Sequence, residues 1–148
     1  MKKYKLMLLG AIGATVGIIL LQVIASNTDI ALLVAPFGAT FVLIFALPDS
    51  PLSKPRNIAG AYLISTSISL VVYEILGDNF LFLGLAFGIS FILMQLTKTL
   101  HPPVGAIPII IMLSPPDWLF VLSPILVGVL IILVYERFYR FISSKINS

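Results

Sequence analysis

Six apolar segments divide the chain, and its polar residues lie mostly between them. The segments cover residues 6–25, 30–47, 58–76, 80–97, 104–113 and 119–135. The first, third, fourth and sixth run for 17–20 residues, the length of a helix that crosses about 30 Å of hydrocarbon. The pattern therefore predicts four full membrane spans. The basic start and apolar run could also form a secretory signal, but residues 6–25 exceed the 7–15 apolar residues typical of one.

The second and fifth segments are broken. Pro36-Phe-Gly38 interrupts the second, and the fifth is too short to cross as a helix. The two match each other, because Pro36-Phe-Gly-Ala39 and Pro103-Val-Gly-Ala106 are followed by a proline at the same offset. The first helix of each half carries a G-x-x-x-G pattern, at Gly13/Gly17 and Gly84/Gly88. We interpret the chain as two repeats of helix, broken half-helix segment and helix, at about 6–76 and 80–140. Chance similarity in an apolar sequence rich in Gly, Pro and Ala is the alternative.

The positive charges predict how the segments cross. If all six cross with the N-terminus inside, all nine Lys and Arg lie in the inner stretches, which are 1–5, 48–57, 98–103 and 136–148. If the broken segments re-enter instead, Lys54, Arg56 and Lys98 move outside. Because Lys and Arg favour the cytoplasmic side, six crossings with both termini cytoplasmic are favoured. Three crossings per repeat make the second repeat inverted, an architecture in which secondary transporters place broken helices around a substrate site.

Composition agrees with an all-α integral membrane protein and excludes several functions. Residues 1–148 form one transmembrane domain in the lipid bilayer, because 59% of them are hydrophobic and only 10% are charged. The basic residues flank apolar runs, so we expect no nucleic-acid partner. With no cysteine, one histidine and no catalytic or phosphate-binding motif, we expect no enzyme activity, no metal and no cofactor. The expected location is the cell (inner) membrane.

The sequence Lys98-Thr-Leu-His101-Pro-Pro-Val-Gly-Ala-Ile-Pro108 contains the second break. Pro102 and Pro103 favour extended backbone followed by the first turn of a helix, and Gly105 with Ala106 allows close approach. Pro108 requires that helix to start late or to kink. Free N–H groups at the start of a half-helix attract anions. A second such terminus, from the opposite side, is predicted at residues that include a hydroxyl: Pro36, Gly38, Ala39 and Thr40.

Other polar side chains have two interpretations each. His101 either donates hydrogen bonds to a small anion and carries a proton, or it caps a helix end near the headgroups. Arg56, followed by Asn57, either holds an anion at the inner mouth or anchors the chain on the positive side. The hydroxyls at 65–67 and 69 predict helix packing, with a pore-facing role as the alternative for one of them.

Three ordered motifs resemble the HPP family of integral membrane proteins over residues 30–135. They are Pro36-Phe-Gly-Ala-Thr40, Asp49-Ser-Pro-Leu-x-x-Pro-Arg56-Asn57-x-x-Gly60 and His101-Pro-Pro-x-Gly-Ala106. The resemblance implies four transmembrane helices and transport, and plastid and cyanobacterial members are linked to nitrite. Many members have Gly-His where this chain has Ala61-Tyr62, so a mechanism that relies on a second histidine is in doubt.

The expected function is transport of a small solute between two broken helices. The best candidate is a small monovalent anion such as nitrite, where nitrite itself comes from the resemblance. The alternative is a membrane scaffold without transport activity, which acts through helix packing. The G-x-x-x-G faces could also join copies into a homo-oligomer.

Overall fold

The computed structural model describes residues 2–28, 30, 32 and 34–147, with side chains for 4–28, 30, 32 and 34–142. All regular structure in these residues is helical. The main helices are α1 (Lys2–Ser26), α2 (Ala35–Ala46), α3 (Pro55–Leu76), α4 (Phe80–Leu96), α5 (Ile107–Leu113) and α6 (Val127–Asn147). Three short helical segments connect them, namely η1 (Pro51–Ser53), η2 (Pro102–Ala106) and the π-type η3 (Val121–Leu126).

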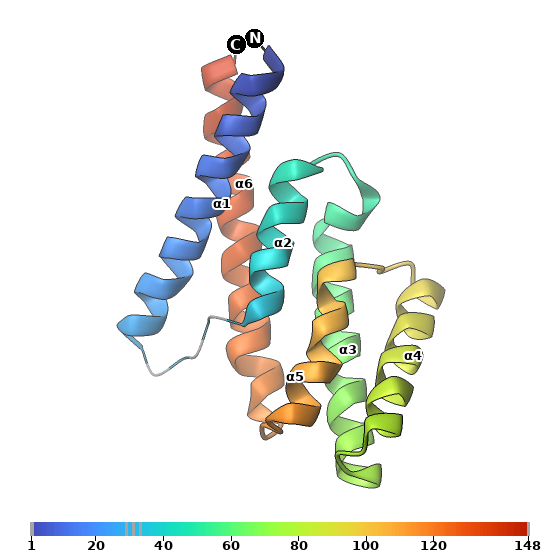
Figure 1. Ribbon diagram of the computed structural model, residues 1–148. Coiled ribbons are helices and arrows are strands. Elements are labelled where there is room, and N and C mark those ends of the chain that lie inside the picture. Colours follow the sequence, from blue (N-terminus) through green and yellow to red (C-terminus); the bar gives the residue numbers. More distant parts are fainter. Residues whose placement is uncertain (1, 29, 31, 33, 148) are drawn as a thin grey trace.

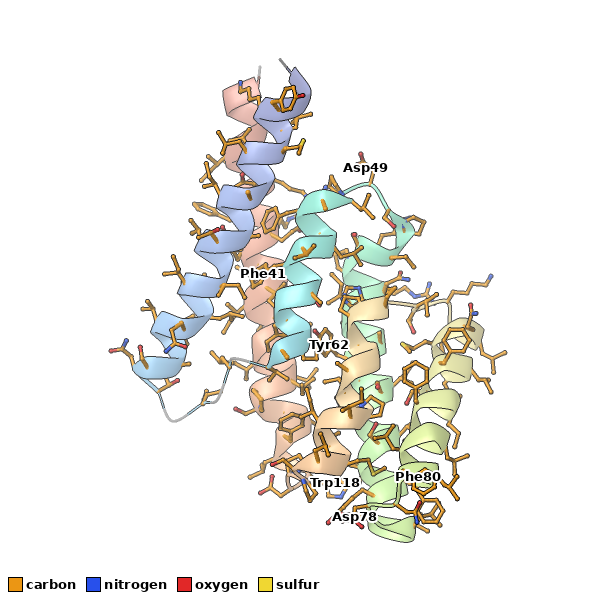
Figure 2. The ribbon with its side chains drawn as sticks, in the orientation of Figure 1. Phe41, Asp49, Tyr62, Asp78, Phe80 and Trp118 are labelled. Carbon is orange, nitrogen blue, oxygen red and sulfur yellow. The ribbon has the colours of Figure 1, made fainter. Side chains whose placement is uncertain are left out.

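Consecutive helices run in opposite directions, so both termini lie at one end of the bundle (Figure 1). At that end α1 and α6 extend beyond the other helices (Figure 1). Asp49 follows α2 toward the same end, whereas Asp78, Phe80 and Trp118 gather at the opposite end (Figure 2). The bundle thus places Asp49, in a stretch expected inside the cell, at the opposite end from Asp78 and Trp118 (Figure 2).

Local sequence sets the limits of several helices. Proline occupies the first turn of both α2 and α3, where its missing N–H costs nothing. The Asn79 side chain accepts a hydrogen bond from the Leu81 N–H at 2.9 Å and caps α4. Gly77 ends α3 with φ +89°, a left-handed conformation that glycine adopts without a steric penalty.

Three helical stretches are long and apolar enough to cross a membrane: Tyr4–Ser26, Pro55–Leu76 and Val121–Ile142. The shorter apolar stretches are Ala35–Ala46, Phe80–Leu96 and Pro102–Leu113. The sequence predicted α4 as a fourth full span, and α4 has 17 residues, which is the lower limit of the predicted length and places it among the shorter apolar stretches. The stretch Val121–Ile142 also starts irregularly, because Ser123, just before Pro124, has non-helical φ/ψ.

Helix α3 lies at the centre of the packing, in contact with α4, α5, α6 and η3. On the other side α1 packs against α2 and α6. The glycine pair in α1 makes that contact possible: a Cβ on Gly17 would lie 2.5 Å from the Phe41 ring, and one on Gly13 would lie 2.7 Å from Phe45. In contrast, a Cβ on Gly84 or Gly88 of α4 would have no atom within 4 Å. Among the described residues, only the first G-x-x-x-G face therefore packs against another helix.

Candidate functional site

His101 lies just before η2 and is completely buried. Its Nε2 is 2.8 Å from Thr40 Oγ1 in α2, and its Nδ1 is 2.8 Å from the Leu52 carbonyl oxygen in η1. Thr40 Oγ1 is also 2.9 Å from the Tyr62 hydroxyl in α3. Figure 2 shows Tyr62 in the middle of the bundle, behind α2 and α5. The histidine thus joins three separate elements through one hydrogen-bonded chain.

The chemistry of the partners sets the direction of this chain. The Leu52 carbonyl can only accept, so His101 Nδ1 carries the hydrogen. In the neutral ring Nε2 then accepts from the Thr40 hydroxyl, and Thr40 accepts from the Tyr62 hydroxyl. A charged ring would instead donate from Nε2 to the Thr40 hydroxyl, and Thr40 would then donate to Tyr62. The Tyr62 hydroxyl would be left with no acceptor among these three side chains. The arrangement therefore fits a neutral imidazole.

A second group of hydrogen bonds ties the loop before His101 to the start of α3. Arg56 Nη2 donates to the Thr97 carbonyl oxygen at 3.2 Å, and Asn57 Nδ2 donates to the Leu100 carbonyl oxygen at 2.9 Å. A Cβ on Gly60 would lie 2.6 Å from Thr99 Cγ2, so the glycine lets this loop lie against α3. Arg56, Asn57 and Gly60 thus hold the loop against the start of α3 at three successive points.

The end of α2 belongs to the same region, because the Ser53 hydroxyl donates to the Leu47 carbonyl oxygen at 2.8 Å. We call this whole region the polar junction and define it by the side chains Thr40, Ser53, Arg56, Asn57, Tyr62 and His101. It brings together residues from all three sequence motifs. His101 and Arg56 are the two side chains predicted to contact a small anion. Arg56 is exposed, whereas His101 is fully buried.

Of the residues predicted at the first break, some lie in or beside the polar junction and others lie apart from it. Thr40 enters the polar junction, and Pro36 is buried at the start of α2. Phe37 is buried beside Tyr62, with ring centroids 5.2 Å apart. Ala39 is exposed and a Cβ on Gly38 would have no neighbour within 4 Å, so these two residues lie apart from the junction.

The second break forms as the prolines require. Pro102-Pro103 opens the 3₁₀ turn η2, and α5 begins at Ile107, after the N-cap Ala106, with Pro108 in its first turn. This late start is one of the two outcomes predicted from Pro108. Because Pro108 has no N–H, the Val104 carbonyl accepts instead from the Ile107 N–H and, at a long 3.5 Å, from the Ser65 hydroxyl.

A cavity of about 210 Å³ borders this second break. It is lined by residues of α3, α4 and the break itself: Ser65, Phe87, Ser90, Phe91, Met94, Leu100, Pro102, Gly105 and Pro108. Of the predicted site residues, Pro102 and Gly105 are in this lining, whereas His101, Arg56, Asn57 and the first break are not. The cavity therefore lies beside one break rather than between the two.

Ser90 was not predicted, and it is the most unusual group in the cavity wall. It is 1% exposed, and its hydroxyl has no hydrogen-bond partner. Its oxygen has almost no exposed surface, so the hydroxyl lies inside the wall of the cavity rather than at its surface. Among the described residues, no group of three or more His, Cys, Asp or Glu side chains is placed to hold a metal ion.

Comparisons with known proteins agree with the motifs. A family model described as the transmembrane region of HPP proteins matches residues 1–147. A transmembrane protein of Dictyostelium discoideum is 35% identical over 130 residues, which cover 80% of this chain and 46% of that protein. A second transmembrane protein of this organism is 33% identical over 86 residues, which cover 55% of this chain and 28% of the relative. The chain spans less than half the length of these relatives, and no solved structure matches it. The sequence motifs, the apolar helices and the family match together show that the chain belongs to the HPP family of transmembrane proteins.

Proposed function

We propose that this protein carries a small solute across a membrane, past the second break. The single observation that carries the proposal is the cavity of about 210 Å³ against η2 and the start of α5. Broken backbone at membrane depth is tolerated where it is buried in protein or lines a cavity, and here it does line one. A break with such a cavity is the feature that transporters use to bind solutes.

The arrangement of the helices supports the same proposal. Each half of the chain contains a first helix, a shorter helix preceded by a proline break, and a third helix. Because consecutive helices alternate in direction, the second half runs opposite to the first (Figure 1). This matches the inverted repeat that we propose at about 6–76 and 80–140. The positive charges favour cytoplasmic termini, and we propose the cell (inner) membrane as the location.

The residues take two roles in this proposal. Pro102, Pro103, Gly105 and Ala106 form the break that the solute passes. The polar junction fixes the loop that precedes the second break, through the side chains Thr40, Arg56, Asn57 and His101. Nitrite, as a small monovalent anion, is the solute that family resemblance favours.

Uptake into proteoliposomes tests this function. Nitrite uptake should exceed that of protein-free liposomes several-fold, because the cavity provides a route that the lipid does not. The assay compares nitrite, nitrate, formate, chloride and small neutral solutes at equal protein density. If none of these solutes shows protein-dependent uptake, the transport proposal is wrong.

A scaffold without transport activity is the second candidate, and the open face of α4 favours it. A Cβ on Gly84 or Gly88 would meet no atom of the described residues within 4 Å, and small residues let membrane helices approach closely. This face could join two copies of the chain into a homo-oligomer. The same uptake panel separates the two candidates, because a scaffold associates without moving any solute.

A further inference from the structure

The wall of the cavity beside the second break is uncharged. Only Ser65 and Ser90 contribute polar side chains, and the remaining lining residues are apolar. Among the residues that the structure describes, no Lys, Arg or His side chain lines the cavity. This composition is unexpected for a site that would hold a bare anion.

The two side chains predicted to hold an anion, Arg56 and His101, make hydrogen bonds outside the cavity. The Arg56 guanidinium is exposed and bonded to the Thr97 carbonyl oxygen. Both ring nitrogens of His101 are bonded, to Thr40 and to Leu52, in an arrangement that fits the neutral ring. Although Leu100 and Pro102 line the cavity, His101 between them turns its ring into the polar junction.

An anion in such a cavity would lose its hydration without gaining a partner charge. One or two hydroxyl groups cannot offset that loss, and a buried carboxylate-like group takes up a proton instead. An uncharged acid meets neither difficulty. Its O–H group costs much less to bury than a full charge, so the apolar wall admits the acid more readily than the anion.

The size of the cavity suits this class of molecule. An apolar protein cavity of about 150 Å³ is large enough to hold benzene. A cavity of about 210 Å³ therefore has room for a small acid of a few heavy atoms, alone or with a water molecule. The aromatic and methionine side chains of the wall would surround it.

We propose that the solute passes the second break as the uncharged conjugate acid of a small monovalent anion. This inference rests on the proposed transport function and specifies the form in which the solute moves. The anion takes a proton from water at the entry side, crosses as the acid and returns the proton to water at the exit side. One proton thus accompanies each anion, and no net charge crosses the membrane.

A potential-clamped uptake assay tests the inference. Wild-type proteoliposomes receive nitrite or formate while a potassium gradient with valinomycin sets the membrane potential, and uptake by protein-free liposomes is subtracted. Protein-dependent uptake should be the same at either sign of the potential. It should rise about tenfold for each unit fall in pH at a fixed total nitrite concentration, because the uncharged acid rises by that factor.

The possible outcomes separate the two proposals. Protein-dependent uptake that follows the membrane potential and ignores pH would overturn the uncharged-acid inference and leave transport standing. The absence of protein-dependent uptake of every solute at every pH would overturn transport itself, and the inference with it. Uptake that ignores the potential and follows the acid concentration supports both.

Discussion

Replacement of His101 with alanine is expected to lower the free energy of unfolding by about 3–6 kcal/mol. The substitution removes the partner of the part-buried Leu52 carbonyl oxygen and leaves the buried Thr40 hydroxyl with only its bond to Tyr62, at about 1–3 kcal/mol for each lost partner. Loss of the fully buried ring adds a cavity, which also destabilises the fold. Because domains are stable by only about 5–15 kcal/mol, this variant should be close to unfolding. Denaturation in detergent, followed by the fluorescence of the single tryptophan, Trp118, measures the change.

Two conservative variants assign the loss to individual hydrogen bonds. In His101→Asn the side-chain amide can take the place of Nδ1 and keep the bond to Leu52. In His101→Gln the longer side chain can reach Thr40 and accept from its hydroxyl. Each should recover about 1 kcal/mol relative to alanine, the usual value of one hydrogen bond. An alanine variant with wild-type stability would contradict a joining role for His101 and favour a purely functional one.

Gly128→Ala is expected to destabilise the bundle by about 1–3 kcal/mol, the usual cost of overpacking a core. Its Cβ would lie 2.2 Å from the Phe37 ring, which is fully buried. The ring cannot move freely, because it packs on Tyr62, and Tyr62 is bonded to Thr40. The strain should therefore reach the polar junction.

Gly84→Ala is the matched control for this substitution. It also replaces a helical glycine with alanine, but the new methyl group meets no atom within 4 Å. Alanine is favoured over glycine in a helix by about 1 kcal/mol, so this variant should equal or exceed the wild type in stability. Detergent denaturation of the two variants in parallel should thus give changes of opposite sign. Equal stability of both variants would show that α6 does not pack closely on Phe37.

The sequence was most informative where a structural feature depends on neighbouring residues. The apolar runs predicted the helices, and Pro108 limited α5 to a late start or a kink, of which the structure shows the late start, because hydrophobicity and proline geometry act locally. The length of α4 was overestimated by one residue, since Thr97 caps the helix rather than continuing it. Helix ends depend on capping, which an apolar run does not specify.

The polar junction could not be predicted, because its contacts join residues that are far apart in the sequence. His101 is 61 residues from Thr40 and 49 residues from Leu52. Tyr62 was noted only as a departure from the family pattern, although a hydroxyl within an apolar segment is itself a sign that a buried partner exists. Ser90 gave a weaker signal, because a single serine in a membrane helix more often packs than binds.

The central claim is that the solute passes through the cavity beside the second break. Ser90→Leu tests it most directly, because the larger side chain would occupy the cavity from a buried position on α4. Gln95→Leu is the control, since it places the same side chain at an exposed position of the same helix. Protein-dependent nitrite uptake should fall to near the protein-free level in Ser90→Leu and stay at the wild-type level in Gln95→Leu. Wild-type uptake by a folded Ser90→Leu protein would contradict the account.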